Sequence, residues 1–236
     1  MMQKNISGES RSILKSYLPL VDFLGRLIGP HCEVVLHDLT VPERSVVAIA
    51  NGHISGREVG APLTDFALRM LKEKAHAAID FLHEYEGALK SGGSVRSSTF
   101  FIKNGEGGLI GLLCFNVDMS GLQGLHKKLD DFICAYCNIN GSAIRAAAQP
   151  FRQVQESETF SESVEDLMST SINKALAAYN LPPDRLSLQE REEVVDTLNK
   201  KGFFQLRGAV ESIAQTFGVS EATVYRYLKN VQKKGG

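Results

Sequence analysis

The spacing of apolar positions predicts that the chain begins with a helix and a β-hairpin. Between residues 11 and 28 apolar side chains recur every three or four positions, the period of one helix face, although Pro19 would start or interrupt that helix. Residues 32–39 and 45–50 are short runs rich in β-branched side chains, and a turn with a proline separates them. These two runs therefore predict a pair of strands.

Three further strands are predicted in the middle of the chain. Residues 81–89 are a weak strand candidate, whereas residues 94–103 alternate between two faces. Residues 109–117 are apolar on both faces, which is typical of a central strand covered on each side. A short helix that Thr64 or Asp65 can cap precedes these strands, so we expect a sheet of five strands with helices.

The pattern changes after the last of these strands. Residues 122–139 repeat apolar positions at steps of three and four, the seam of a helix that packs either on its own sheet or along a second copy. Residues 149–183 hold few bulky side chains and several serines, as a linker does, with one amphipathic helix among them. The pattern leaves open whether that helix connects, dimerises or docks.

The last fifty residues or so predict three helices, and the final two read as a helix-turn-helix. Ser187 opens the first with the capping box SLQE. Residues 208–217 have helical apolar spacing and stop at Gly218, after which Ser220 can cap the next helix. Two short helices joined by a glycine turn, with small and polar side chains opening the second, fit a DNA major groove. The alternative is that two ordinary packed helices share this spacing.

Composition and charge narrow the classes of function. A net charge of −1 over 236 residues excludes an overall basic binder, so contact with DNA must be local. The second helix offers such a place, because the basic residues Arg226, Lys229, Lys233 and Lys234 follow Ala222 without an acid. No apolar run is long enough to span a bilayer, and the start lacks the core of a secretory signal. We therefore expect a cytoplasmic protein without a membrane partner.

The cysteines and histidines do not form a recognisable metal or catalytic pattern. Cys134 and Cys137 make one CxxC spacing inside the predicted seam helix, and a zinc site would need further ligands at matching spacing. We expect structural thiols, with redox or metal sensing as the alternative. The six histidines are scattered, and the chain shows no phosphate loop or triad motif, so we expect no enzyme, no metal and no cofactor.

Five blocks of the sequence carry a resemblance to a known family. They are FLGRLIGPHCEVVLHDL (23–39), IANGHISGREVGAPLTDFAL (49–68), RSSTFFIKN (96–104), GLIGLLCFNVD (108–118) and GFFQLRGAVESIAQTFGVSEATVYRYL (202–228). Together they resemble bacterial transcriptional regulators with a YheO-like PAS domain followed by a helix-turn-helix. The resemblance implies a sensor domain and a DNA-binding domain, usually in a dimer or higher oligomer, and it implies no particular ligand.

The expected fold class is therefore α+β, with a PAS-like antiparallel sheet domain and flanking helices followed by an all-α helix-turn-helix domain. We expect the sensor domain over residues 11–140 and the DNA-binding domain over residues 187–236. Residues 141–186 are expected to form a linker with one possible helix.

The loop at residues 51–65 is the best candidate for a ligand site. It gathers hydrogen-bond donors and one cation, and its glycines let the backbone turn tightly enough to aim them inward. This suits a carboxylate held by Arg57 through two hydrogen bonds, and a solvated loop with local turn bonds is the alternative. The candidate ligand residues are His37, Asn51, His53, Ser55, Arg57, Thr64 and Ser98, and none is expected to be catalytic.

These observations predict a ligand-responsive transcriptional regulator that senses a small polar metabolite such as an amino acid. Its partners would be double-stranded DNA, a small-molecule effector and further copies of the chain, as a homodimer or higher homo-oligomer. The alternative is a protein-interaction module in which both domains bind proteins and contact no DNA. The residues expected to meet DNA are Ser220, Glu221, Ala222, Thr223, Tyr225, Arg226 and Lys229, with Arg226 suited to a guanine edge and Lys229 to a phosphate.

Overall fold

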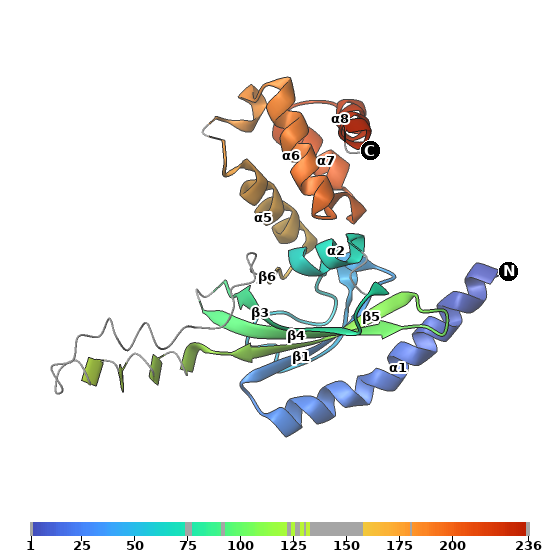
Figure 1. Cartoon of the computed structure of the whole chain (residues 1–236), viewed down its shortest axis with the longest axis vertical. Helices are drawn as coiled ribbons and strands as arrows, with labels where there is room; N and C mark the ends of the chain where they lie inside the picture. The colour runs from blue at the N-terminus through green and yellow to red at the C-terminus, as the bar shows by residue number, and fades with distance from the viewer. Residues whose placement is uncertain are drawn as a thin grey trace.

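A computed structural model describes residues 2–73, 77–90, 93–121, 124–125, 128–129, 131–132, 158–179 and 181–234. In these ranges a sheet with helices on both faces is followed by a group of helices (Figure 1). The helices are α1 (Met2–Ile28), α2 (Asp65–Lys72), α5 (Val164–Leu176), α6 (Leu188–Lys200), α7 (Ala209–Phe217) and α8 (Glu221–Lys234), with short 3₁₀ turns at Pro42–Arg44, Pro183–Arg185 and Phe203–Gln205. The strands are β1 (Cys32–Asp38), β2 (Val46–Ala50), β3 (Phe81–Ala88), β4 (Ser94–Lys103), β5 (Leu109–Asp118) and β6 (Glu158–Thr159).

The sheet has the order β2-β1-β5-β4-β3-β6, and its first five strands pair antiparallel. The predicted hairpin is present as β1 and β2, and β5 lies inside the sheet between β1 and β4. The two apolar faces of β5 are explained by this central position, because helices cover the sheet on both sides there. The predicted α+β class is confirmed.

The expectation of five strands was incomplete, because β6 adds a sixth. Gly87 and Ala88 of β3 pair in parallel with Glu158 and Thr159 of β6. A strand of two residues has no measurable alternation, so the hydrophobic pattern cannot reveal it. The segment predicted as a linker therefore contributes to the sheet, and its expected amphipathic helix is present as α5.

Helix α1 covers one face of the sheet and forms a separate apolar core with it. Leu14 and Val21 of α1 pack with Val34 and Leu36 of β1 in this core. The helix passes through Pro19 without a break, and the packing on either side of the proline offsets the hydrogen bond that it removes. The helix also begins earlier than residue 11, where the apolar spacing first becomes clear.

A second core joins the opposite face of the sheet to α2 and the C-terminal helices, which lie beyond α2 in Figure 1. Lys72 at the end of α2 donates to the side chain of Asn199 in α6 at 2.8 Å. Glu43 accepts from the backbone N–H of Arg207 at 2.7 Å. The sheet and the C-terminal helices therefore meet through α2 and the turn that follows β1.

The predicted seam at residues 122–139 falls largely outside the described residues. Of its apolar positions, Leu125, Leu129 and Phe132 are described, and each is more than half exposed. Cys134 and Cys137 also lie outside the described residues, so the expectation of structural thiols, with redox or metal sensing as the alternative, stays a prediction.

Close packing of α1 predicts the effect of adding one methyl group at Gly111. A Cβ atom there would contact the side chain of Leu14 and lie 2.7 Å from the backbone oxygen of His37, which cannot move aside. We expect Gly111→Ala to lower the free energy of unfolding by about 1–3 kcal/mol, measured by urea denaturation. Gly121→Ala is the control, because its added methyl group meets no atom within 4 Å. Equal stability of the two variants would contradict this packing.

Candidate functional site

The turn between α7 and α8 has the geometry that the helix-turn-helix requires. Gly218 adopts a left-handed conformation with φ of 64°, which ends α7. The N–H of Val219 then donates to the carbonyl of Ala214 at 2.9 Å. Ser220 begins α8 by accepting from the N–H of Thr223 at 3.3 Å. The predicted glycine stop and serine cap are both present.

The inner side of α8 is fixed to the other helices. Val224 and Tyr227 of α8 pack in the same apolar core as Ile213 and Phe217 of α7, and all four are buried. Asn230 adds a hydrogen bond of 2.8 Å from its side-chain amide to Glu192 of α6. This packing holds α8 in one orientation, so its outer face is presented as a rigid surface.

The residues predicted to meet DNA lie on that outer face or at its edge. Ser220, Glu221, Ala222, Tyr225, Arg226 and Lys229 are exposed, and Thr223 is half-buried beside the cap. Tyr225 is 59% exposed although it is a large aromatic side chain, which is the property of a contact residue. The guanidinium of Arg226 lies 6.0 Å from the ring centroid of Tyr227.

The seven predicted ligand residues separate into two groups in the structure. Ser55, Arg57, Thr64 and His37 are buried on the face of the sheet that α2 covers. Asn51, His53 and Ser98 lie elsewhere. His53 is exposed, and Ser98 accepts at 3.4 Å from the N–H of Glu84 on the opposite face of β4.

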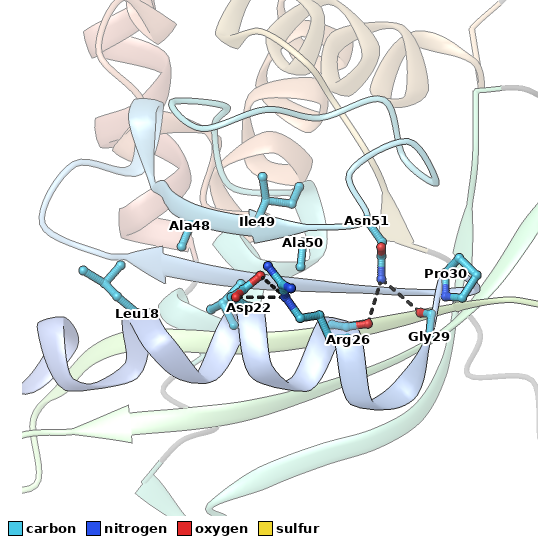
Figure 2. A pocket seen from close by; sticks show the side chains of 11 residues that line it. Leu18, Asp22, Arg26, Gly29, Pro30, Ala48, Ile49, Ala50 and Asn51 are labelled. Carbon is cyan, nitrogen blue, oxygen red and sulfur yellow. Dashed lines mark hydrogen bonds and ion pairs between the residues drawn. The ribbon is translucent and has the colours of Figure 1, made fainter.

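Asn51 closes the end of α1. Its side-chain amide donates to the carbonyls of Gly25 and Gly29 at 3.3 and 3.0 Å (Figure 2). It also donates to the carbonyl of Cys32 at 2.7 Å. The residue borders an open groove of about 520 Å³ between α1 and β2, where Asp22 pairs with Arg26 on the surface. Because the amide donors of Asn51 already bind three carbonyls, its main role in this structure is to cap the helix.

Ser55 belongs to a buried hydrogen-bonded chain that crosses the sheet. Its hydroxyl donates to one carboxyl oxygen of Glu33 at 2.5 Å, and the amide of Asn116 donates to the other at 2.7 Å. Ser97 donates in turn to the side-chain oxygen of Asn116 at 2.8 Å. Both carboxyl oxygens of Glu33 are therefore satisfied by neutral donors.

Thr64 belongs to a second buried group that is less complete. Its hydroxyl donates to Oε1 of Glu158 at 2.6 Å and accepts from the N–H of Ala67, which caps α2. Oε2 of Glu158 has no hydrogen-bond partner, and neither has Nε of Arg57, although both atoms are buried. Arg57 donates through Nη2 to the carbonyl of Pro62 and interacts electrostatically with Glu33 and Glu158.

The two buried groups just described together form what we call the buried polar cluster. Its seven residues are Glu33, Ser55, Arg57, Thr64, Ser97, Asn116 and Glu158. Burial raises the pKa of Glu158 from 4.5 to about 7, against the opposing effects of the Thr64 hydroxyl and Arg57. Burial also raises the pKa of Glu33. Burial lowers the pKa of Arg57, and the two carboxyls counteract that shift.

A small cavity adjoins the cluster beneath α2. Its volume is about 10 Å³, room for roughly one water molecule. The aromatic ring of Phe66 stacks on that of Tyr85 at 4.5 Å, and both rings line the cavity with Glu158. Burial raises the pKa of the Cys114 thiol to about 12 and lowers the pKa of His37 well below its usual value, so the cavity holds no thiolate and no imidazolium. The neutral thiol of Cys114 is a poor nucleophile. The arrangement suits recognition of a charged ligand by the buried polar cluster.

Sequence reasoning missed the two carboxylates of the cluster. Glu33 interrupts the apolar run CEVVLHDL, and a single acid in a buried strand is a signal that could have found it. Glu158 lies in the segment read as a linker, and nothing in the local pattern marks it. Its hydrogen bond to Thr64 joins residues 94 positions apart, which only the fold brings together.

The described part of the chain shows neither a group of metal-ligating side chains nor a membrane-spanning helix. No group of three or more histidine, cysteine or acidic side chains there could hold a metal ion. None of the helices described is both long and apolar enough to cross a bilayer.

Comparison with known proteins finds two domain families. Residues 8–134 match the YheO-like PAS domain, and residues 167–229 match an HTH domain. The chain is 34% identical over 217 residues to the uncharacterized protein YheO of Escherichia coli K12, covering 92% of this chain and 84% of that protein. It is 30% identical to an uncharacterized protein of Haemophilus influenzae, over 97% and 95% of the two chains. It is 28% identical to the transcriptional regulator DauR of Pseudomonas aeruginosa, over 94% and 96%.

The raised pKa of Glu158 predicts a pH dependence of stability. An acid whose folded pKa is raised stabilises the fold below its unfolded value of 4.5, and this contribution is lost as pH rises through about 7. Glu158→Gln is neutral at every pH, so it should remove a loss of up to roughly 3 kcal/mol between pH 4.5 and 7.5. The measurement is the free energy of unfolding against pH. Glu58→Gln, at an exposed position of the loop that follows β2, is the control and should follow the wild type.

Proposed function

We propose, from the premise that this chain belongs to the YheO-like PAS domain family and carries an HTH domain, that it is a DNA-binding transcriptional regulator controlled by a small polar effector. The relative named as a transcriptional regulator matches almost the whole chain, which supports this assignment. The same relationships favour a regulatory protein over an enzyme.

The observation that carries the DNA-binding assignment is the outer face of α8. It is a rigid helix surface with exposed polar and basic side chains, and its inner face is buried against α6 and α7. A second helix of this kind lies in the major groove in helix-turn-helix complexes. On this proposal Arg226 reads a guanine edge and Lys229 contacts a phosphate, while the N-terminal residues of α8 lie nearest the bases.

The buried polar cluster supports the proposed effector site. Ser55, Arg57 and Thr64 come from one loop and converge under α2, with His37 on the adjoining cavity. The unpartnered Nε of Arg57 is a donor that a carboxylate could use. A small polar metabolite such as an amino acid fits this chemistry better than an apolar ligand, because an apolar ligand would leave these polar atoms without partners.

Helix α2 offers a route from that site to the DNA-binding helices. Its residues Phe66 and Met70 line the cavity, whereas Lys72 bonds to Asn199 of α6. Asp65 at its start bonds to the N–H of Thr159 and to Lys174 of α5. A ligand that moves α2 would therefore change contacts with two helices of the C-terminal group.

We propose that the regulator acts as a homodimer or higher homo-oligomer. Several large apolar side chains are exposed on α1 and on the part of the sheet beside it: Leu20, Phe23, Leu27, Phe81, Phe100 and Val117. Exposed apolar groups of this size are typical of interaction surfaces. Two copies could place their α8 helices at half-sites about 34 Å apart, one turn of DNA.

Substitutions on α8 test the DNA-binding assignment. Arg226→Ala should reduce the preference for the protein's own promoter over altered sites by about 1–3 kcal/mol at the affected base. Lys229→Ala should weaken binding to all sequences and reduce the slope of log affinity against log salt by about 1. Fluorescence anisotropy at several salt concentrations measures both effects.

Lys15→Ala removes an exposed positive charge from α1 and is the control, which should bind as the wild type does. If the intact protein prefers its promoter no more than random DNA, the DNA-binding assignment fails and the protein-interaction alternative takes its place.

A thermal-shift screen of amino acids and small carboxylates tests the effector site. A ligand that binds the folded protein at about 100 times its dissociation constant stabilises it by about 2.7 kcal/mol and raises the melting temperature. We expect such a shift in the wild type and in the control Glu58→Gln, and its loss in Arg57→Met. A ligand that shifts Arg57→Met as strongly as the wild type would exclude Arg57 from the site.

A further inference from the structure

The buried polar cluster contains more acidic than basic groups. Glu33 and Glu158 are two carboxyls, and Arg57 is the one guanidinium that interacts with both. All three side chains are at least 96% shielded from solvent. A buried ion without a partner is costly, so this imbalance calls for either a bound proton or a bound cation.

The two carboxyl groups differ in whether both of their oxygens accept hydrogen bonds. Both oxygens of Glu33 accept hydrogen bonds, from Ser55 and Asn116. Oε1 of Glu158 accepts from Thr64, and Ser97 and Tyr85 also interact with this carboxyl group, but its Oε2 has no hydrogen-bond partner. Glu158 also lines the cavity beneath α2. The missing positive partner therefore belongs at Glu158, on the cavity side of the cluster.

We propose that Glu158 binds the protonated amine of a small effector that enters beneath α2. This inference rests on the proposed effector site and adds to it a second recognised group. The ammonium N–H groups supply the donors that Oε2 lacks, and its charge balances the second carboxylate. Nε of Arg57 is left for an acidic group on the same molecule.

Because the cavity is small, binding of such a ligand would change the structure of the protein around it. A space of about 10 Å³ holds roughly one water molecule, so an organic amine must displace the wall formed by Phe66, Ala67 and Met70 of α2. The other oxygen of the same carboxyl group accepts from Thr64, and Thr64 is the cap of α2. Binding thus acts on the start and on one face of the same helix.

Matched sets of compounds test which groups are recognised. We would use alanine, leucine and glutamine, each with the amine that lacks its carboxylate and the carboxylic acid that lacks its α-amino group. Isothermal titration at pH 7.5 should find at least one set in which the amino acid binds at least tenfold more tightly than the acid.

Equal affinity of the amino acid and the acid would overturn the role of Glu158 and leave the proposed carboxylate-sensing site intact. A result in which none of the compounds binds, so that the cavity holds only a water molecule, would overturn this inference too. The DNA-binding assignment is judged separately by anisotropy without any ligand, so its failure is distinguishable from either result.

A variant shows whether Glu158 is the residue responsible. Glu158→Gln keeps the size of the side chain and removes its charge, so it should reduce the preference for the amino acid over the acid to less than threefold. Glu58→Gln should keep the full preference. Thermal unfolding in the absence of ligand establishes that Glu158→Gln is folded.

Proton release by the wild-type protein provides a measurement that needs no variant. The groups that face Glu158 are Arg57 from the loop, Asp65 from α2, Tyr85 from β3 and Cys114 from β5. Because the pKa of Glu158 is raised to about 7, an ammonium that binds its ionised form must expel a proton below that pH.

Titrations at pH 6.5 in buffers of different ionisation enthalpy should therefore show proton release on binding, and titrations at pH 8.5 should show none. Affinity should fall severalfold from pH 8 to pH 6. Binding that is independent of pH, with no proton released at pH 6.5, would overturn the proposal.

Discussion

The cost of removing charged groups from water is the constraint on which the YheO-like PAS domain of this protein depends. Glu33, Arg57 and Glu158 lie in the interior, where each makes hydrogen bonds with protein groups in place of bulk solvent. Such groups tolerate few positions, because each small displacement leaves a charge unpaired. They therefore hold the loop after β2, the sheet and β6 in one arrangement.

The same region joins the sheet of the PAS domain to the C-terminal helices by direct packing. Helix α2 is packed on two sides. One side covers the buried polar cluster, and the other belongs to the core shared with the C-terminal helices. The backbone approaches very closely there, because a Cβ on Gly202 would lie 2.7 Å from the carbonyl of Leu68. Packed interiors do not deform gradually, so a shift at α2 is passed on as a change of contact.

What could be predicted from the sequence follows from how local each signal is. Gly218 and Ser220 act within one turn of the backbone, and the predicted helix stop and helix cap were both confirmed. Ser55, Arg57 and Thr64 were singled out by their residue types, but their acidic counterparts were not. Glu158 comes from a distant two-residue strand, and its pairing depends on the completed sheet. Asn51 was read as a ligand donor because spacing alone cannot show that it faces the end of α1.

The way in which Asn51 ends α1 has a further consequence. The carbonyls at that helix terminus are met by a neutral amide, whereas Arg26 in the last turn pairs with Asp22 on the surface. An amide does not titrate, so the hydrogen bonds that close α1 do not depend on the protonation of the capping side chain. The opposite face of the sheet instead holds the ionisable side chains of Glu33, Arg57 and Glu158. The two faces of one sheet thus differ in how far their polar contacts depend on pH.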